Sequence, residues 1–252
     1  MKRTAKTSTV EISHPEKVFW PDEGYTKQDL SDFYQEVFPL LRTYVADRIL
    51  TLERCPNGLR GPCFYQKEKP AGLPPDTPTK RIRNASGPRK STNYVVGGSL
   101  KTQIALVNLG CISVHVTGSR AKTFPRPDWV CFDLDPSSGQ FADAARAGQY
   151  LKEALDTLKL LSFPKTSGSR GLHVFVPVRV GPTAEEVLKF SQEVVARVAS
   201  SHPNESDVKP SLEPSTFNLG NFRRRLKTGN PWAEFFNSRQ TLKNAMARLR
   251  NL

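Results

Sequence analysis

The sequence lacks a hydrophobic run of the roughly 18 residues that a membrane span requires, and its first residues lack the apolar core of a signal peptide. Its cysteines form no C-x-x-C pair, which excludes the usual spacing of a zinc site. We therefore expect the thiols to be reduced and the protein to be intracellular. The cysteines are Cys55, Cys63, Cys111 and Cys131.

The sequence has few acidic residues relative to basic ones. The 252 residues include 37 Lys and Arg against 24 Asp and Glu, which gives a formal net charge of +13. A bias of this size indicates a polyanionic partner, and nucleic acid is the first candidate. The chain is long enough to bury a substantial core and shows no internal repeat, so we expect a single domain over residues 1–252.

The most informative stretch is residues 129–136, an apolar run that ends in two carboxylates one residue apart. Side chains alternate between the faces of a β-strand, so Asp133 and Asp135 would share one face, with Cα atoms roughly 6.6 Å apart. That spacing suits carboxylates that converge on divalent metal ions. The alternative is a polar strand end without a function, and these residues alone do not separate the two interpretations.

A second stretch, residues 165–176, places a loop of small residues directly before a strand. The backbone amides of such a loop can approach an anion closely, and Arg170 adds a planar charged group that suits phosphate. His173 would stand at the start of the strand, where it could donate to a phosphate oxygen. An ordinary turn with a surface histidine is the alternative, but the acidic strand earlier in the chain favours a phosphate site.

Helices are predicted where apolar residues recur at helical spacing after a capping pair. Thr26 with Asp29 begins one such helix and Thr183 with Glu186 another, and residues 141–158 form a further amphipathic pattern. A C-terminal helix follows Trp232.

Lysines flank the start of the first predicted helix. Lys17 and Lys27 are either solvated charges or a site for a phosphate near the helix N-terminus.

Residues 48–54 and 61–67 alternate like the strands of a hairpin, and residues 112–116 form a strand with His115 and Ser113 on one face. The basic segment 80–90 is a candidate surface for the DNA backbone. Together with the helices, these strands predict an α/β (α+β) fold of two mixed β-sheets flanked by helices.

In this order along the chain, the motifs resemble the polymerase domain of bacterial ligase D, a member of the archaeo-eukaryotic primase superfamily. The resemblance is colinear over most of the chain, and it implies a primase-polymerase palm that contains the acidic strand. The matching motifs are residues 14–21 and 25–27, Arg54 with Pro56 and Gly58, Phe64 with Gln66 and Lys67, residues 108–110, 132–136, 165–168 and 171–174, and Pro231, Trp232, Gln240 and Leu242 in the tail.

The resemblance also implies roles for individual residues. Asp133 and Asp135 would be catalytic and would hold Mn²⁺ or Mg²⁺. The ions would activate the primer 3′-hydroxyl and neutralise the leaving pyrophosphate. Nucleoside triphosphate would be bound by Lys165, Ser167, Arg170 and His173. DNA would be contacted by Lys17, Lys27, Arg54, Phe64 and Lys67, of which Lys17 and Lys27 would grip a 5′-phosphate and Phe64 could equally be core packing.

One departure from the family pattern concerns the third metal carboxylate, which the family supplies from a later strand. After the helix that begins at Thr183, the sequence runs through a polar, proline-punctuated segment directly to the family's tail, without such a strand. Asp207 and Glu213 are the candidate substitutes, and both lie in proline-flanked polar loops. The sequence thus indicates either a degenerate natural copy or a shortened gene.

Two functions from different classes follow. The first is a metal-dependent, template-dependent DNA/RNA nucleotidyltransferase that acts at DNA ends or gaps in non-homologous end joining. The second is a non-catalytic module that binds DNA ends or nucleotides. A phosphatase of the haloacid dehalogenase type ranks third, because the Thr and the later acidic pair of that class are missing. The expected partners are DNA with 5′-phosphorylated gaps or ends, nucleoside triphosphates, Ku and a separate DNA ligase. The expected location is the cytoplasm, in association with the nucleoid.

Overall fold

The computed structural model describes residues 10–202, 212 and 214–250. The chain folds into two compact units. Met1–Lys122 with Leu219–Asn221 form unit 1, and Thr123–Asn218 with Phe222–Leu252 form unit 2. The single domain predicted over residues 1–252 stays a prediction. No helix of the described part of the chain is long and apolar enough to cross a membrane.

Unit 1 is built from antiparallel strand pairs and two helices. Its main sheet has the order β4-β3-β7, and β1-β2 and β5-β6 form separate hairpins. Helix α1 begins with the predicted capping box of Thr26 and Asp29, and it packs on α2 through a core that includes Leu30 and Ile104. The elements are β1 (Val18–Trp20), β2 (Tyr25–Thr26), α1 (Lys27–Val45), β3 (Arg48–Arg54), β4 (Phe64–Gln66), β5 (Thr79–Arg83), β6 (Ser91–Val95), α2 (Leu100–Asn108) and β7 (Cys111–Arg120).

A disulfide joins Cys55 and Cys63 in unit 1, so the expectation of reduced thiols is wrong for this pair. The predicted hairpin explains it. Arg54 of β3 lies opposite Phe64 of β4, so the next residue on each side also comes together, with Cα atoms 4.3 Å apart. Cys111 is a buried free thiol. The register of β3 with β4 decides which cysteines pair, and the spacing of the cysteines in the sequence does not reveal this register.

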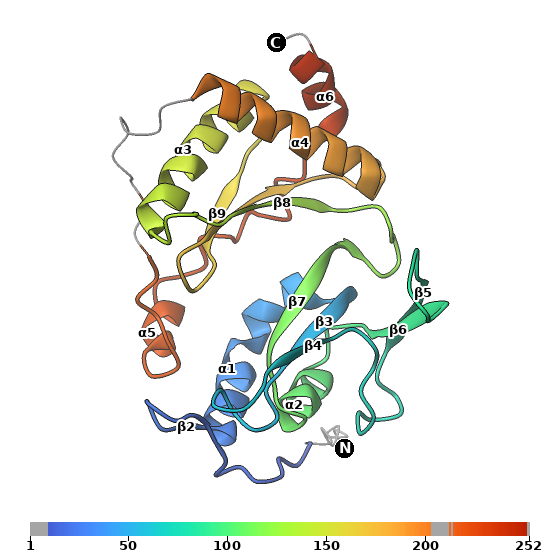
Figure 1. Ribbon diagram of the computed structural model, residues 1–252, viewed down its shortest axis with the longest axis vertical. Coiled ribbons are helices and arrows are strands. Elements are labelled where there is room, and N and C mark those ends of the chain that lie inside the picture. The colour runs from blue at the N-terminus through green and yellow to red at the C-terminus, as the bar shows by residue number, and fades with distance from the viewer. Residues whose placement is uncertain (1–9, 203–211, 213, 251–252) are drawn as a thin grey trace, which may run out of the picture. The chain divides into compact units, whose positions relative to one another are not determined.

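Unit 2 is a three-stranded antiparallel sheet with the order β8-β10-β9, and α3 and α4 cover one of its faces (Figure 1). Helix α4 begins with the predicted capping box of Thr183 and Glu186. Phe132, Leu172 and Phe190 belong to the apolar core between sheet and helices. The elements are β8 (Trp129–Leu134), α3 (Phe141–Thr157), β9 (Phe163–Thr166), β10 (Leu172–Pro177), α4 (Ala184–Ser201), α5 (Phe222–Leu226) and α6 (Leu242–Arg250).

The C-terminal tail covers one end of the other face of this sheet. Trp232 and Phe235 stack with ring centroids 4.8 Å apart and contact Phe175 of β10 and Phe163 of β9. The opposite end of the face, at Asp133, stays exposed. The predicted α/β class of sheets flanked by helices is therefore confirmed. Within the described residues the named strands pair antiparallel, and a parallel bridge joins Val178 and Gln240.

Candidate functional site

Asp133 of β8 lies directly opposite His173 of β10 on the exposed face of the unit 2 sheet. The His173 Nε2 atom is 3.2 Å from Asp133 Oδ1. Burial alternates along β8 as predicted, with Phe132 buried under the helices and Asp133 exposed. The sequence prediction that these two residues serve one site agrees with their contact.

Asp135 is the first residue after β8, because the strand ends at Leu134. Its carboxylate packs against Gly171, where a Cβ would lie 2.5 Å from Asp135 Oδ1 and 3.1 Å from Ser167 Oγ. A side chain at position 171 would therefore displace the carboxylate or the serine. Glycine is required here so that the loop can approach Asp135 closely.

The loop at residues 167–171 has the form of an anion site. The Ser167 hydroxyl donates to the Gly171 carbonyl (3.0 Å) and accepts from the Gly171 amide (3.1 Å), so it closes the loop on itself. Among the described contacts, the amides of Gly168, Ser169 and Arg170 have no acceptor. Successive unpaired amides in such a turn are suited to bind phosphate oxygens.

Arg170 and Lys165 supply positive charge beside this loop. The Arg170 guanidinium lies over the turn that follows Asp135, since a Cβ at Gly139 would be 3.3 Å from its Nη1 atom. Lys165 of β9 lies opposite His173. Desolvation lowers the pKa of Lys165, while Cys131 and Asp133 act to raise it. The Lys165 ammonium therefore lies close enough to interact with both groups.

Cys131 occupies the position two residues before Asp133 on the same face. Desolvation raises the pKa of its thiol to about 12, and the Asp133 charge adds to the shift. The thiol is therefore protonated at physiological pH.

The sheet edge at β8 has no neighbouring strand in the part of the chain that the structure describes. The Val178 amide donates to the Asp128 carbonyl (3.0 Å), so these two residues are a hydrogen-bonded pair of the ladder. Such pairs alternate with non-bonded pairs in an antiparallel ladder. The backbone groups of Phe132 therefore point towards β10, and those of Cys131 and Asp133 point to the open edge of β8. An added strand would therefore pair with the residues that carry the acidic site.

Within the described residues, no third carboxylate joins Asp133 and Asp135 in a metal-binding group. The described residues contain no group of three or more His, Cys, Asp or Glu side chains that could hold a metal ion. The substitutes considered from the sequence, Asp207 and Glu213, lie outside the described residues. Two exposed carboxylates still fit Mg²⁺ or Mn²⁺, because such ions are often held by one or two carboxylates together with substrate phosphates and water.

Lys17 and Lys27 of unit 1 are the second candidate site. Lys17 Nζ donates to the Pro56 carbonyl (2.6 Å) and to Asn57 Oδ1 (3.2 Å), which leaves one of its three N–H groups without a partner among the described contacts. Lys27 is buried, and its Nζ donates to the carbonyls of Ser13 (2.6 Å) and Asn108 (3.2 Å). Desolvation lowers the pKa of Lys27, and the charge of Lys17 adds to this shift.

The first backbone amides of α1 already have acceptors, so they do not contribute to a phosphate site. The expectation that Lys17 and Lys27 hold a phosphate near this N-terminus stays a prediction. The amides of Lys27 and Gln28 donate to the carbonyls of Lys17 (2.8 Å) and Pro15 (3.0 Å), and the Asp29 amide donates to Thr26 Oγ1. The first donors of the helix are thus already used. An anion here would be held by the ammonium groups.

The hairpin of β3 and β4 carries the other predicted DNA contacts. The Arg54 guanidinium donates to the Leu109 carbonyl (2.8 and 3.0 Å) and to Gln66 Oε1 (2.7 Å), and it lies over the Phe64 ring. Phe64 is exposed, which does not support the alternative of core packing. Lys67 is exposed and lines a pocket of ≈ 460 Å³ together with Arg89.

The basic segment 80–90 forms part of the hairpin of β5 and β6, which the sequence did not predict as strands. Arg81 and Arg83 are both exposed on β5, two residues apart and therefore on one face. The segment is thus available as the basic surface that its composition suggested.

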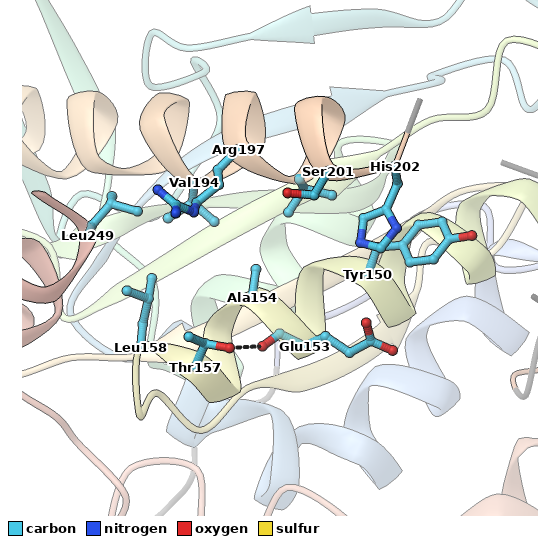
Figure 2. Close-up of a pocket in the computed structure, with 11 residues that line it drawn as sticks. Tyr150, Glu153, Ala154, Thr157, Leu158, Val194, Arg197, Ser201, His202 and Leu249 are labelled. Atoms are coloured by element: carbon cyan, nitrogen blue, oxygen red, sulfur yellow. Dashed lines mark hydrogen bonds between the residues drawn. The ribbon is translucent and has the colours of Figure 1, made fainter. Parts of the chain in front are cut away.

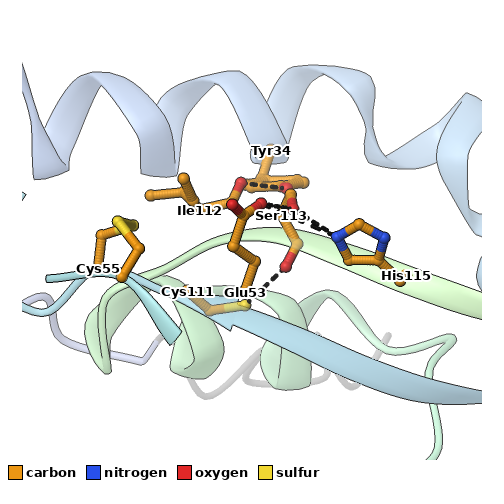
Figure 3. A network of polar contacts seen from close by, with 8 residues as sticks. Tyr34, Glu53, Cys55, Cys111, Ile112, Ser113 and His115 are labelled. Atoms are coloured by element: carbon orange, nitrogen blue, oxygen red, sulfur yellow. Dashed lines mark hydrogen bonds and ion pairs between the residues drawn. A yellow bond between two sulfur atoms is a disulfide. The ribbon is translucent and has the colours of Figure 1, made fainter. Parts of the chain in front are cut away.

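A polar network between β3 and β7 was not predicted (Figure 3). Glu53 lies opposite Ser113, whose hydroxyl donates to Glu53 Oε2 (2.5 Å) and lies 3.3 Å from His115 Nε2. The Tyr65 ring meets the His115 ring edge-on. The sequence placed Ser113 and His115 on one face, but only the pairing of β3 with β7 brings Glu53 to them.

A pocket of ≈ 330 Å³ lies between α3, α4 and α6 (Figure 2). Stacked rings of Tyr150 and His202, with centroids 3.8 Å apart, form one end of it. None of the predicted site residues is among its described lining residues. The helices that form it cover the face of the sheet opposite to Asp133, so this pocket is separate from the acidic site.

An antiparallel sheet with helices on one face, and with acidic residues beside a small-residue loop on the other, is the arrangement of a primase-polymerase palm. The family model described as LigD, primase-polymerase domain, matches residues 26–217, and the chain belongs to this family. The resemblance found in the sequence is therefore confirmed.

Known proteins show the same similarity. The chain is 29% identical over 212 residues to the multifunctional non-homologous end joining DNA repair protein LigD of Mycobacterium tuberculosis H37Rv, covering 79% of this chain and 27% of the relative. The bifunctional LigD of Bacillus subtilis 168 is 29% identical over 190 residues, 75% of this chain and 30% of the relative. The chain thus spans under a third of the length of these relatives.

A solved structure confirms the fold. The polymerase domain of M. tuberculosis ligase D in complex with DNA superposes with a TM-score of 0.71 at 26% identity, covering 84% of this chain and 74% of that chain.

Proposed function

We propose that this chain is a template-dependent nucleotidyltransferase of the primase-polymerase type that adds nucleotides at DNA ends or gaps during non-homologous end joining. The observation that carries the proposal is the contact of Asp135 with the loop at residues 167–171, beside Asp133. Carboxylates next to successive loop amides that lack an acceptor among the described contacts suit a nucleoside triphosphate with its metal ion. The phosphates would bind the loop, and the metal ion would bind the carboxylates.

Different residues of unit 2 would bind the metal ions and the triphosphate. Asp133 and Asp135 would hold Mn²⁺ or Mg²⁺, which when bound lowers the pKa of the attacking hydroxyl and neutralises charge on the leaving group. The amides of Gly168 to Arg170 and the guanidinium of Arg170 would bind triphosphate oxygens. Lys165 would add charge from β9. His173 would orient Asp133 by their contact of 3.2 Å.

Unit 1 would hold the DNA. The spare donor of Lys17 would bind a 5′-phosphate, and Lys27 would strengthen the local field from its buried position. Arg54 would keep the Phe64 ring in place for contact with a base, and Lys67 would contact the backbone. The relative of known structure was solved with DNA, which supports this assignment. Ku and a DNA ligase are the partners that end joining would require.

The test is primer extension on a gapped duplex with a 5′-phosphate, with Mn²⁺ and either ribo- or deoxynucleotides. Incorporation that follows the template base and is lost in Asp133→Asn is the expected result. Tight binding of the same duplex without any incorporation would overturn the proposal.

The second candidate is a non-catalytic module that binds DNA ends or nucleotides. It is favoured by one observation, the unpaired edge of β8 in the described part of the chain, where no third carboxylate stands beside Asp133. For such a module, Lys17→Ala would weaken binding to recessed ends in a salt-sensitive manner, whereas Asp133→Ala would leave it unchanged and no nucleotide would be incorporated.

A further inference from the structure

The Cys55–Cys63 disulfide closes the turn that holds Lys17. Both oxygens that accept from the Lys17 ammonium, the Pro56 carbonyl and Asn57 Oδ1, lie between the two cysteines in the sequence. This turn therefore positions Lys17, the lysine that is assigned to the 5′-phosphate.

Noncovalent contacts attach residues 55–60 of this turn to the rest of unit 1. The Arg60 guanidinium pairs with Asp22 at the surface (3.3 Å). The Leu59 amide donates to the Phe19 carbonyl (2.9 Å), and the Cys55 amide to the Gly110 carbonyl (2.8 Å). Gly58 is tightly packed, because a Cβ there would lie 2.8 Å from the Val18 carbonyl oxygen. Residues 61–63, on the side of β4, are joined to β3 by the disulfide, since the ladder of β3 and β4 begins only at Arg54.

The ladder that would remain after reduction is short. It joins three residue pairs, and the last of them is Arg54 with Phe64, directly beside the disulfide. β4 lies at the edge of its sheet, with β3 as its neighbour. Loss of the covalent link would therefore loosen Phe64 and the turn that seats Lys17 at the same time.

We propose that the Cys55–Cys63 pair is a redox switch that sets the affinity of the chain for 5′-phosphorylated DNA ends, an inference that rests on the proposed function. In the oxidised form the turn is closed and Lys17 is positioned. In the dithiol form the turn opens and the preference for a 5′-phosphate falls. The two free thiols, Cys111 and Cys131, are not part of the switch.

The chemistry is thiol–disulfide exchange with a dithiol reductant. Cys55 is fully buried and Cys63 is exposed, so the attacking thiolate reaches the Cys63 sulfur. A mixed disulfide forms at Cys63, and Cys55 leaves as a thiolate that takes up a proton. The second thiol of the reductant then attacks the mixed disulfide, which releases Cys63 and leaves the reductant oxidised, so two electrons pass to the protein.

The experiment compares oxidised and dithiol-reduced protein by fluorescence anisotropy on two gapped duplexes that differ only in a 5′-phosphate or 5′-hydroxyl. Alkylation and mass measurement confirm that reduction adds two reactive thiols. We expect the preference for the phosphate to fall by about threefold or more on reduction. Hydrogen exchange of residues 56–62 should quicken in the same samples.

Two variants control the comparison. Cys63→Ser, at an exposed position, should show the weak preference with and without reductant. The double variant Cys55→Ser/Cys63→Ser should do the same, which excludes effects of the reductant on Cys111 and Cys131. Equal preference in both redox states of the native chain would overturn the switch and leave the proposed function intact. A chain that shows no preference in either state would refute the 5′-phosphate grip, and the switch with it.

Discussion

His173 Nε2 and Asp133 Oδ1 are 3.2 Å apart because β10 and β8 pair with these two residues in direct register. One carboxylate oxygen of Asp133 thereby contacts the imidazole. A metal ion bound by Asp133 would find a carboxylate whose rotamer is already fixed, which reduces the entropic cost of forming the site.

Asp133→Asn should reduce nucleotide addition by more than about 100-fold, since it removes the charge of one of the two carboxylates that the described residues bring to the site. Affinity for gapped DNA should stay within about twofold, because the DNA contacts are assigned to unit 1. Asp156→Asn is the matched control, as Asp156 lies on α3 and pairs with Lys152. Extension assays and anisotropy provide both measurements, and an active Asp133→Asn enzyme would contradict the assignment.

Gly171→Ala should impair the site without a change at any polar residue. The new Cβ would lie 2.5 Å from Asp135 Oδ1, so the carboxylate or the loop must shift. Weaker Mn²⁺ binding by calorimetry and a higher KM for nucleotide are expected. Gly181→Ala is the control, because the nearest atom to its Cβ would be 3.9 Å away and its backbone requires no positive φ. Equal Mn²⁺ affinity of both variants would show that the contact does not matter.

Much of the local structure could be predicted because it depends on neighbouring residues. The capping boxes at Thr26 and Thr183 and the alternation of burial along β8 follow from short-range rules, and all three are confirmed. The closeness of Asp133 to His173 was suggested only by the order of motifs, because the register of two strands is a long-range property.

The errors have the same origin. Cys55 and Cys63 were expected to be thiols because their spacing matched no known motif, yet the register of one hairpin brings them together. Glu53 was missed because β7, which brings Ser113 opposite it, lies far along the sequence.

Lys17→Ala and Lys27→Ala should differ although both remove one positive charge. Lys17→Ala should abolish the preference for a 5′-phosphate and lower the salt slope of DNA binding by about one, with little change in stability. Lys27→Ala should also reduce the free energy of unfolding by about 1–3 kcal/mol, because it removes a buried side chain and its partly buried hydrogen bonds to the carbonyls of Ser13 and Asn108.

Urea denaturation and anisotropy at several salt concentrations would measure these effects. Lys101→Ala is the charge-matched control, since Lys101 is bound to Asp76 at the surface. A phosphate preference that survives Lys17→Ala would exclude the direct contact.

Proton uptake should accompany the binding of a 5′-phosphate. Desolvation and the charge of Lys17 hold the pKa of Lys27 below its ordinary value of 10.5, with Glu16 opposing them. Between the folded-state pKa and 10.5 the unfolded chain keeps the proton that the folded chain releases, so this group makes the fold more stable as the pH rises through that window. A bound phosphate would favour the charged form and raise the pKa of Lys27 again.

The expected result is therefore a net uptake of protons on binding in the alkaline range below pH 10.5, and an affinity that falls as the pH rises there. Calorimetry in two buffers of different ionisation enthalpy measures the uptake directly. The duplex with a 5′-hydroxyl should show less uptake, because it lacks the anion beside Lys27. Equal uptake with both duplexes would mean that the phosphate is not bound near this lysine pair.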